Sequence, residues 1–218
     1  METDRSKYQL EVKKPQNRII QDGEHIIAYQ SPEVQFMLKI EDGKSLNTRY
    51  GLFEHDCFIG KRYGEKVWSK DKRYFFYALK IDRTFFTQNQ CHRTQILYSI
   101  DISMAILFLN IKPGDVVCES GTGSGSMSYS IGKALGVTGH LYTFEFNEER
   151  ASEIKKDFER YNITNITATR RDVYSDGFTI DGVLGGESGV KADSIFIDLP
   201  SPWKATKHAS DIIKLGGR

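Results

Sequence analysis

The stretch that decides the fold is Val116–Met127, which reads Val-Val-Cys-Glu-Ser-Gly-Thr-Gly-Ser-Gly-Ser-Met. Its apolar start leads into a turn that contains Gly121, Gly123 and Gly125, and residues 126–135 can then form a helix. A buried strand, a glycine turn and a helix in this order bring bare backbone close to a ligand in α/β proteins. Glycine suits such a turn because it adopts positive φ cheaply and has no Cβ to hold a ligand away. A strand-to-helix turn that binds no ligand is the alternative interpretation.

An acidic residue at the end of the next predicted strand indicates the class of ligand. The segment His140–Phe146 is rich in aromatic and aliphatic residues, and its Glu145 follows the last glycine of the turn by 20 residues. A carboxylate at this distance can hydrogen-bond the two hydroxyls of a ribose, which points to a nucleoside. Ser126 stands where the dinucleotide pattern Gly-x-Gly-x-x-Gly has its third glycine. Glu119 would repel a pyrophosphate but suits the cationic end of S-adenosylmethionine, so the sequence favours this methyl donor over a dinucleotide.

The composition of the whole chain limits the classes of function. A chain of 218 residues can bury a sizeable core in one or two domains. Lys plus Arg (30) nearly balance Asp plus Glu (29), so a nucleic-acid substrate requires local basic patches or a partner that supplies them. Three cysteines without a Cys-x-x-Cys motif predict reduced thiols. No stretch approaches the ~18 apolar residues of a membrane span, and we expect a soluble intracellular protein.

The texture of the sequence divides the chain into three parts. Residues 1–23 are polar and are expected to form a flexible N-terminus. Residues 24–88 contain short strand-like runs between turn residues, which predict a small antiparallel β-domain, a barrel in its simplest form. The expected strands are His25–Gln30, Val34–Ile40, Thr48–Glu54, Lys66–Ser69 and Arg73–Ile81.

Residues 89–218 alternate predicted strands and helices, which favours a parallel sheet. Apolar spacing predicts a helix over Asp101–Leu109 that starts at Ser99 or Asp101, and another over Glu148–Tyr161. Two further strands are expected at Ile166–Arg170 and Ser194–Ile197. Residues 175–191 are rich in glycine and are expected to form a mobile surface loop.

Acidic residues stand at the ends of four successive predicted strands. They are Glu119, Glu145, Asp172 and Asp198. Because a ligand of an open α/β sheet lies outside the carboxyl ends of its strands, we expect these side chains around one ligand. Asp172 is placed to accept a hydrogen bond from the exocyclic amine of the donor's adenine, and Arg150 can pair with Glu145 or lie over the donor. The alternative is that acidic residues simply collect in loops.

The stretch Asp198–Trp203 reads Asp-Leu-Pro-Ser-Pro-Trp. Its two prolines stiffen the backbone and disfavour both helix and ladder pairing. A carboxylate at one end and an indole at the other predict a slot for a flat polar ring. A rigid loop with a core Trp is the alternative.

Four blocks together resemble the catalytic subunit of the eukaryotic tRNA (adenine-N1-)methyltransferases. They read His-Arg-Thr-Gln-Ile-Leu-Tyr-Ser (92–99), Val-Cys-Glu-Ser-Gly-Thr-Gly-Ser-Gly-Ser (117–126), Gly-His-Leu-Tyr-Thr-Phe-Glu (139–145) and Asp-Leu-Pro-Ser-Pro-Trp (198–203). The resemblance implies an N-terminal β-barrel, a Rossmann-like methyltransferase domain over residues 89–218 and S-adenosylmethionine as donor. It implies methylation of an adenosine in the T-loop of tRNA, with no metal. It also implies a homologous non-catalytic subunit in a heterotetramer, and a location in the nucleus.

The resemblance also assigns site residues. The donor pocket would be formed by Leu97, Glu119, Gly121, Gly123, Ser124, Gly125, Ser126, Met127, Glu145, Arg150, Asp172, Val173 and Asp198. Asp198 would be the central catalytic residue and would accept a hydrogen bond from the exocyclic amine of the target adenine. Gln95 and Tyr98 would line the pocket of that adenine.

The chain stops at Arg218, where the family continues into another strand. We therefore expect the C-terminal strands of the sheet to be missing, which would leave the fourth strand with a bare flank and exposed apolar surface. The activity of these 218 residues alone is thus in doubt. Two alternatives to the catalytic subunit are a non-catalytic RNA-binding subunit of the same fold and a methyltransferase that acts on another amine.

Overall fold

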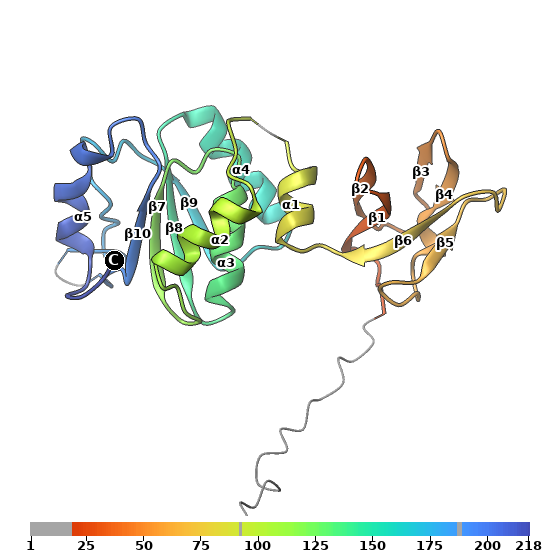
Figure 1. Cartoon of the computed structure of the whole chain (residues 1–218), viewed down its shortest axis with the longest axis horizontal. Coiled ribbons are helices and arrows are strands. Elements are labelled where there is room, and N and C mark those ends of the chain that lie inside the picture. Colours follow the sequence, from red (N-terminus) through yellow and green to blue (C-terminus); the bar gives the residue numbers. More distant parts are fainter. Residues whose placement is uncertain (1–18, 92, 187–188) are drawn as a thin grey trace, which may run out of the picture. The chain divides into compact units, whose positions relative to one another are not determined.

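The computed structural model describes residues 19–91, 93–186 and 189–218, so the predicted flexibility of residues 1–18 lies outside the described range, as does His92. The chain divides into two compact units between Ile81 and Asp82 (Figure 1). This boundary comes earlier than the one predicted between residues 88 and 89, because an unpredicted helix, α1 (Arg83–Asn89), belongs to the second unit. The ring of Phe86 in α1 stacks on Tyr129 of that unit, with centroids 3.9 Å apart.

The first unit is antiparallel β-structure, as predicted. Its strands are β1 (His25–Ser31), β2 (Val34–Lys39), β3 (Ser45–Thr48), β4 (Gly51–Glu54), β5 (Lys66–Trp68) and β6 (Phe75–Lys80), with a short 3₁₀ turn at His55–Cys57. The hydrogen-bonded order β2-β1-β6-β5 makes an open four-stranded sheet, and β3 pairs with β4 as a separate hairpin. Within the described residues β2 and β5 are sheet edges, so the predicted barrel is not confirmed.

The single strand expected over Thr48–Glu54 is wrong, because the chain turns inside it. Thr48 pairs with Gly51 across a two-residue hairpin loop. The Thr48 hydroxyl accepts a hydrogen bond from the N–H of Tyr50 and donates one to the carbonyl of Gly51. Gly51 adopts a φ of +108°, which other residues rarely reach. The two loop residues, Arg49 and Tyr50, are not typical turn residues, so the sequence did not indicate this hairpin.

Residues 19–23 belong to the folded unit and not to the flexible N-terminus predicted through residue 23. The side chain of Ile20 is fully buried in a core cluster with Phe53, Phe58 and Phe76. The N–H of Ile20 donates to the carbonyl of Lys61 at 2.8 Å. Ile20 is thus a core residue within a polar stretch, and the composition of that stretch does not reveal it.

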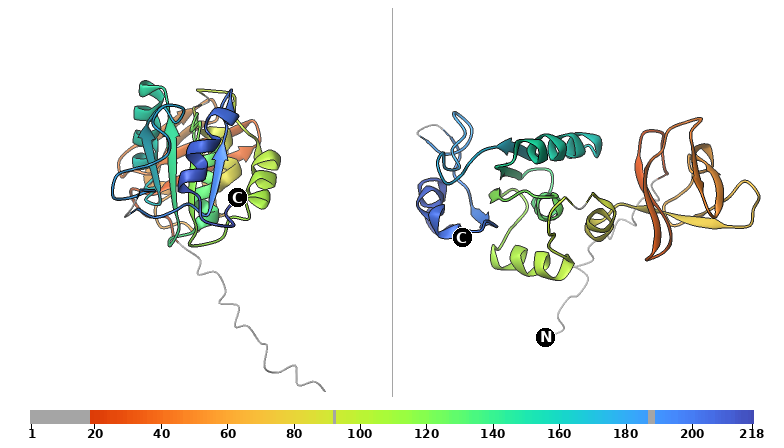
Figure 2. Two further views of the ribbon diagram at one scale, coloured as in Figure 1. Left: turned by 90° about the vertical axis from the view of Figure 1, so that its left-hand side faces the viewer. Right: turned by 90° about the horizontal axis from the view of Figure 1, so that it is seen from above.

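The second unit contains the predicted parallel sheet. Its strands are β7 (Val116–Ser120), β8 (His140–Glu145), β9 (Ile166–Arg170) and β10 (Ser194–Ile197), in the order β10-β7-β8-β9. Its helices are α1, α2 (Ser99–Phe108), α3 (Ser126–Leu135), α4 (Glu148–Arg160) and α5 (Thr206–Ile212), with a 3₁₀ turn at Pro202–Lys204. One face of the sheet packs against α2, α3 and α4, and the other against α5 and residues 173–192 (Figure 2). The predicted β-α-β-α-β-β order is confirmed.

Two helices were missed for local reasons. Helix α1 has only seven residues, two of them phenylalanine, and its one start signal is Asp82, whose carboxylate accepts the N–H of Phe85 at 2.8 Å. Helix α5 follows the two prolines that argued against a helix. Pro202 opens the 3₁₀ turn, where a missing N–H costs nothing, and α5 begins four residues later.

The glycine-rich residues 175–191 were expected to form a mobile surface loop, and their described part lies only partly at the surface. Phe178 and Leu184 are fully buried, and they pack with Cys118 of β7 and Ile212 of α5. Ile180 and Leu184 form a local bridge. The described part of this stretch therefore covers the second face of the sheet in place of a helix.

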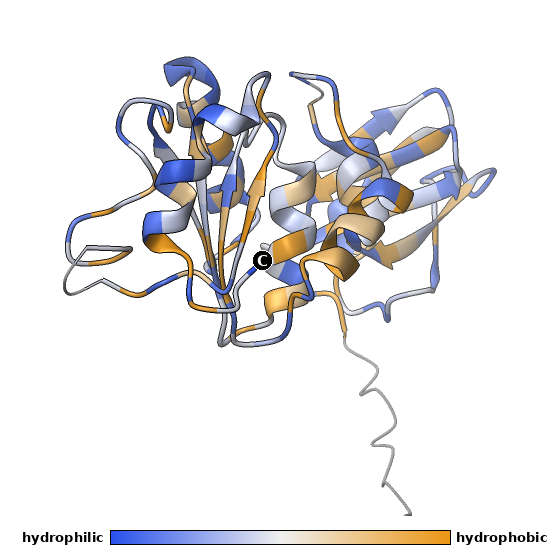
Figure 3. Ribbon diagram, turned by 60° about the vertical axis from the view of Figure 1, so that its left-hand side comes forward, coloured by the Kyte–Doolittle hydropathy of each residue, from blue (hydrophilic) through white to orange (hydrophobic). Residues whose placement is uncertain are grey.

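The predicted bare flank of β10 is covered in part. The N–H of Ile195 donates to the carbonyl of Arg218 at 2.8 Å, and the N–H of Arg218 donates to Asp193. Exposed apolar side chains lie instead on α2, a largely hydrophobic helix (Figure 3), where Ile100, Met104, Leu107 and Phe108 are 46–79% exposed. No helix among the described residues is long and apolar enough to cross a bilayer.

Candidate active site

A cavity of about 650 Å³ lies in the second unit, at the carboxyl ends of the parallel strands. Its volume falls within the roughly 300–1,000 Å³ of small-molecule sites. Thirteen of the predicted site residues line it: Gln95, Leu97, Gly121, Gly123, Ser124, Gly125, Ser126, Met127, Glu145, Arg150, Asp172, Val173 and Asp198. Glu119, Tyr98 and Trp203 do not. The carboxyl-end rule for α/β sheets therefore predicted where this cavity lies and many of the residues that line it.

The glycine turn between β7 and α3 has positive φ at Gly121, Gly123 and Gly125. A Cβ on Gly121 would lie 2.1 Å from the backbone oxygen of Asp198. A Cβ on Gly123 would lie 2.7 Å from the Thr94 hydroxyl, and one on Gly125 would lie 2.4 Å from a side-chain carbon of α4. The sequence predicted that glycine is needed here to admit a ligand. The structure shows a second reason: a Cβ at each of the three glycines would collide with another segment of the chain.

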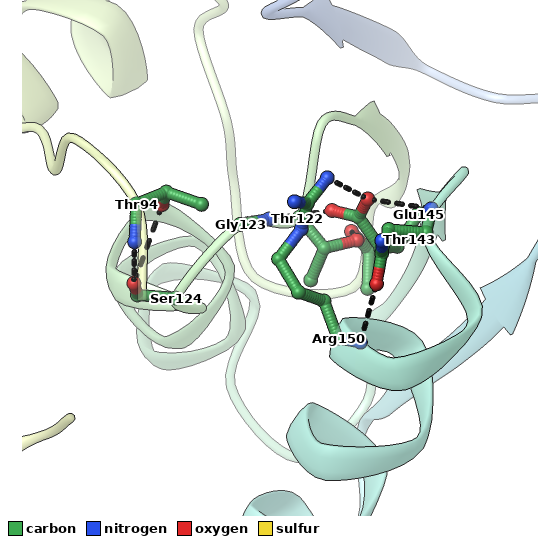
Figure 4. Close-up of polar contacts among 8 residues, drawn as sticks. Thr94, Thr122, Gly123, Ser124, Thr143, Glu145 and Arg150 are labelled. Atoms are coloured by element: carbon green, nitrogen blue, oxygen red, sulfur yellow. Dashed lines mark hydrogen bonds and ion pairs between the residues drawn. The ribbon is translucent and has the colours of Figure 1, made fainter. Parts of the chain in front are cut away.

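Glu145 stands at the tip of β8, and its carboxylate is held by three hydrogen bonds (Figure 4). Oε2 accepts the N–H of Gly123 at 3.1 Å, and Oε1 accepts the N–H of Asn147 at 2.9 Å and the Arg150 guanidinium at 2.8 Å. The predicted Arg150 pairing is thus present. Each carboxylate oxygen can accept two hydrogen bonds, so Oε2 retains capacity for a ligand hydroxyl.

The hydroxyls of Ser124 and Ser126 attach a distant part of the chain to the turn. Ser124 Oγ accepts the N–H of Thr94 at 3.2 Å (Figure 4). It also accepts the N–H of Arg93 at 2.9 Å. Ser126 Oγ donates to the carbonyl of Leu97 at 3.3 Å. Both serines line the cavity as predicted, but the structure shows their side chains engaged in holding residues 93–97.

Glu119 does not contact the cavity, contrary to its predicted role beside the cationic end of the donor. Its side chain is 1% exposed and accepts a hydrogen bond from the Ser128 hydroxyl on α3. Burial raises the pKa of Glu119 from an ordinary 4.5 to about 7, and the nearby charges of Asp198 and Glu145 act in the same direction. Alternation along β7 directs this side chain toward the helix layer.

The buried Glu119 predicts a pH dependence of stability. Because its pKa is raised in the folded state, the native chain binds the proton more tightly, and stability falls as pH rises from about 4.5 to about 7. The expected loss is on the order of 3 kcal/mol. Glu119→Gln keeps the shape and carries no charge, so we expect its stability relative to wild type to rise between pH 4.5 and about pH 7 and to level off above that. Urea denaturation of both proteins at pH 5 and pH 8 measures the difference, and parallel pH profiles would contradict the assignment.

Tyr98 also lies away from the cavity. It caps the N-terminus of α2, and its side chain is 57% exposed. Gln95 does line the cavity, together with Thr94 and Ile96, which the sequence analysis missed. The direction of each side chain in this irregular segment depends on its contacts with the turn, and no sequence period encodes it.

Asp172 and Val173 follow β9 and line the cavity as predicted. The carboxylate of Asp172 accepts the N–H of Tyr174 at 2.9 Å and the hydroxyl of Ser175 at 3.0 Å, so it also shapes the turn. Val173 is 4% exposed and forms an apolar wall. Among the residues that the sequence analysis missed, Phe146, Arg171 and Tyr174 line this side of the cavity. The position of Phe146, directly after Glu145, was the available signal.

Asp198 presents its carboxylate at the cavity. Its N–H donates to the carbonyl of Ser120 at 3.0 Å, which fixes the backbone beside the glycine turn. Within the described residues its side chain has no hydrogen bond or ion pair. Trp203 is 67% exposed and stands outside the cavity, because the 3₁₀ turn leads the chain away after Pro200. The predicted carboxylate–indole slot is therefore wrong on its indole side, and Trp203 is not a core residue either.

Two solved structures of methyltransferases align with this chain over most of its length. A SAM-dependent O-methyltransferase from Thermotoga maritima aligns with a TM-score of 0.75 and 26% identity, over 94% of this chain and 73% of its own. The tRNA (m1A58) methyltransferase TrmI from Aquifex aeolicus aligns with a TM-score of 0.68 and 22% identity, over 92% and 74%. The fold is that of the Rossmann-like SAM-dependent methyltransferases.

Sequence relatives give the family. Residues 74–218 match the family described as tRNA methyltransferase complex GCD14 subunit, and the chain belongs to it. The tRNA (adenine(58)-N(1))-methyltransferase catalytic subunit TRM61 of Candida albicans is 40% identical over 194 residues, which cover 89% of this chain and 56% of that protein. The corresponding catalytic subunit trmt61a of Dictyostelium discoideum is 36% identical over 92% of this chain and 63% of its own length. The chain thus spans little more than half the length of these relatives.

Proposed function

We propose that the protein transfers a methyl group from S-adenosylmethionine to N1 of an adenosine in the T-loop of tRNA, as the catalytic subunit of a two-subunit complex. One observation carries the proposal: Asp198, whose carboxylate is unpaired within the described residues, shares a cavity with Glu145 and the glycine turn. The names of the relatives support the reaction.

The residues that line the cavity fit the methyl donor. The spare acceptor capacity of Glu145 suits a ribose diol, and Val173 and Phe146 offer apolar surface for a nucleobase. The Nε–H of Arg150 is buried without a partner in the described part of the chain, which leaves a donor for a polar ligand atom. Glu119 does not line the cavity, and its role in the donor site is indirect: it accepts a hydrogen bond from Ser128 and so helps to fix α3, the helix after the glycine turn.

For this reaction the enzyme has to position the base and the methyl donor, and it does not have to transfer a proton before the attack. N1 of a neutral adenine has a free lone pair, so no base has to remove a proton before attack. Bound S-adenosylmethionine supplies an electrophilic methyl group. Asp198 accepts a hydrogen bond from the exocyclic amine of the target and stabilises the positive charge that develops on the ring. Gln95 lies on the same cavity wall as a second polar contact for the base. The base must leave its stack at a cost of roughly a few kcal/mol.

A partner that holds the tRNA is part of the proposal. The formal net charge of +1 provides little attraction for a polyanion as a whole. The family description refers to a complex, which supports a second, homologous and non-catalytic subunit in a heterotetramer. A nuclear location is proposed on resemblance alone, and fluorescence microscopy of the tagged protein tests it.

A methylation assay on unmodified tRNA tests the function. The chain is co-expressed with its partner subunit, and the product is digested and analysed by mass spectrometry for N1-methyladenosine. Methylation of a different amine would support the second alternative from the sequence. Failure of the complex to bind S-adenosylmethionine in a calorimetric titration would favour a non-catalytic RNA-binding subunit.

Glu145→Gln is expected to weaken donor binding roughly tenfold, because the neutral amide accepts weaker hydrogen bonds than the carboxylate and loses the Arg150 ion pair. Titration calorimetry with S-adenosylmethionine measures the change. Glu149→Gln is the control, because Glu149 lies in the first turn of α4, close in sequence to Glu145, but does not line the cavity. Unchanged affinity of Glu145→Gln would remove Glu145 from the donor site.

A further inference from the structure

One wall of the cavity has no regular secondary structure. Residues 93–98, here called the wall segment, connect toward α2 without helical or strand hydrogen bonds, and Thr94, Gln95, Ile96 and Leu97 from it line the cavity. Such a segment keeps its place only through contacts with other elements. Those contacts therefore determine the width of the cavity on this side.

The glycine turn supplies neutral contacts to the wall segment, through the hydroxyls of Ser124 and Ser126. Arg93 supplies the charged ones. Its Nε lies 2.6 Å from Oε2 of Glu153, and its Nη2 lies 2.9 Å from Oδ2 of Asp157. These two carboxylates are four residues apart on α4 and so share one face of the helix.

The Arg93 contacts are partly protected from water. The side chain of Arg93 is 18% exposed, and that of Asp157 is 14% exposed, whereas Glu153 is 43% exposed. Ion pairs at such sites are screened less than those on the open surface. A planar guanidinium reaches two carboxylates at once, which a lysine ammonium does less well.

Helix α4 is thereby attached to two different walls of the cavity. Near its N-terminus Arg150 pairs with Glu145 at the tip of β8, and further along Glu153 and Asp157 hold Arg93. Displacing the wall segment from α4 would change the distance between Thr94–Leu97 and the Glu145 side of the cavity.

We propose that Arg93 is a positioning residue of the donor site, which clamps the wall segment to α4 and so presets the cavity for S-adenosylmethionine. This inference rests on the proposed function. Neither Arg93 nor the two carboxylates contacts the cavity directly. The effect of the clamp is on the fraction of molecules in which the wall segment is in place, and donor affinity scales with that fraction.

The chain offers a matched control in Arg160. Its guanidinium pairs with the same Asp157, at 3.6 Å, but it lies on α4 itself and does not reach the wall segment. Arg160→Met thus removes a charge and an ion pair from the same carboxylate. Because the Arg160 pair is longer and its side chain is 62% exposed, this variant controls for the loss of charge at Asp157 and not for the full loss of stability. A purely structural role of Arg93 predicts lower stability of Arg93→Met without faster hydrogen exchange confined to residues 93–98.

Calorimetric titration with S-adenosylmethionine tests the proposal. The chain is co-expressed with its partner subunit as wild type, Arg93→Met, Arg93→Lys and Arg160→Met. We expect about a tenfold loss of affinity for Arg93→Met, as for a wall segment in place one tenth of the time. Arg93→Lys should be intermediate, and Arg160→Met should stay within about twofold. In a Glu153→Gln/Asp157→Asn background, Arg93→Met should cause little further loss, because the interaction is already absent. Hydrogen exchange should be faster at residues 93–98 in Arg93→Met alone.

Wild-type affinity of a folded Arg93→Met would overturn the clamp and leave the donor site intact. If Arg93→Met does not fold, Arg93→Lys and Glu153→Gln take its place, and affinities equal to that of Arg160→Met would overturn the proposal in the same way. A wild-type complex that does not bind S-adenosylmethionine would overturn the proposed function and the clamp together.

Discussion

Asp198→Ala is expected to lower the rate of methyl transfer by about 10³-fold at saturating donor, which is the magnitude typical of removing one preorganised electrostatic contact. The carboxylate lies at the cavity with no partner among the described residues, so its charge is available to the target ring. Transfer to N1 creates a cation, and a neighbouring carboxylate favours that product-like state over the neutral base. The loss should appear in kcat more than in donor affinity, because the interaction strengthens as the reaction proceeds.

Single-turnover methylation of unmodified tRNA, together with calorimetry for the donor, separates the two effects. Asp198→Asn keeps an acceptor oxygen without the charge and should fall between wild type and Asp198→Ala. Asp211→Ala, on the exposed side of α5 and outside the cavity, is the matched control for loss of an acidic side chain. Full turnover by Asp198→Ala would remove the residue from the mechanism.

Gly121→Ala is expected to destabilise the second unit by about 3 kcal/mol, which combines the cost of a positive φ with that of overpacking. Gly121 has a φ of +89°, and the added Cβ would lie 2.1 Å from the backbone oxygen of Asp198. Backbone cannot rotate away as a side chain can. The backbone at Asp198, directly after β10, must therefore shift, and under the proposed function we expect methyl transfer to fall as well.

Thermal denaturation measures the first effect, with an expected decrease in Tm of roughly 10 °C. Gly182→Ala is the control, because Gly182 also has a positive φ, +68°, but its Cβ would meet nothing within 4 Å. The difference between the two variants isolates the contact with Asp198. Equal Tm losses would show that backbone conformation alone requires glycine at position 121.

The order and type of the elements around the turn follow from local features of the sequence. Helix α3 begins and ends where the sequence predicted it, and β9 and β10 have their predicted bounds. These elements depend on apolar periodicity and on glycines at positive φ, both of which are properties of neighbouring residues. The spacing from Gly125 to Glu145 is likewise set by one helix and one strand. Their contributions to the site could therefore be predicted.

Side-chain direction could not be predicted in the same way. Glu119 and Asp198 were both placed at the ligand, yet Glu119 is enclosed beneath α3 and only Asp198 lines the cavity. Tyr98 and Trp203 are exposed outside it. Whether each of these side chains is buried, lines the cavity or is exposed depends on which other element of the fold packs against it.

From the sequence alone came the strand–turn–helix unit, the parallel sheet, the donor class and most of the residues around the cavity, because short-range backbone preferences and the carboxyl-end rule fix them. The tertiary structure decided what touches each glycine of the turn, which described residues between 175 and 191 are buried, and that Arg93 pairs with Glu153 and Asp157 of α4. Those facts depend on contacts between segments that lie tens of residues apart. Such contacts form only when the hydrophobic layers on both faces of the sheet are assembled, and no local pattern records them.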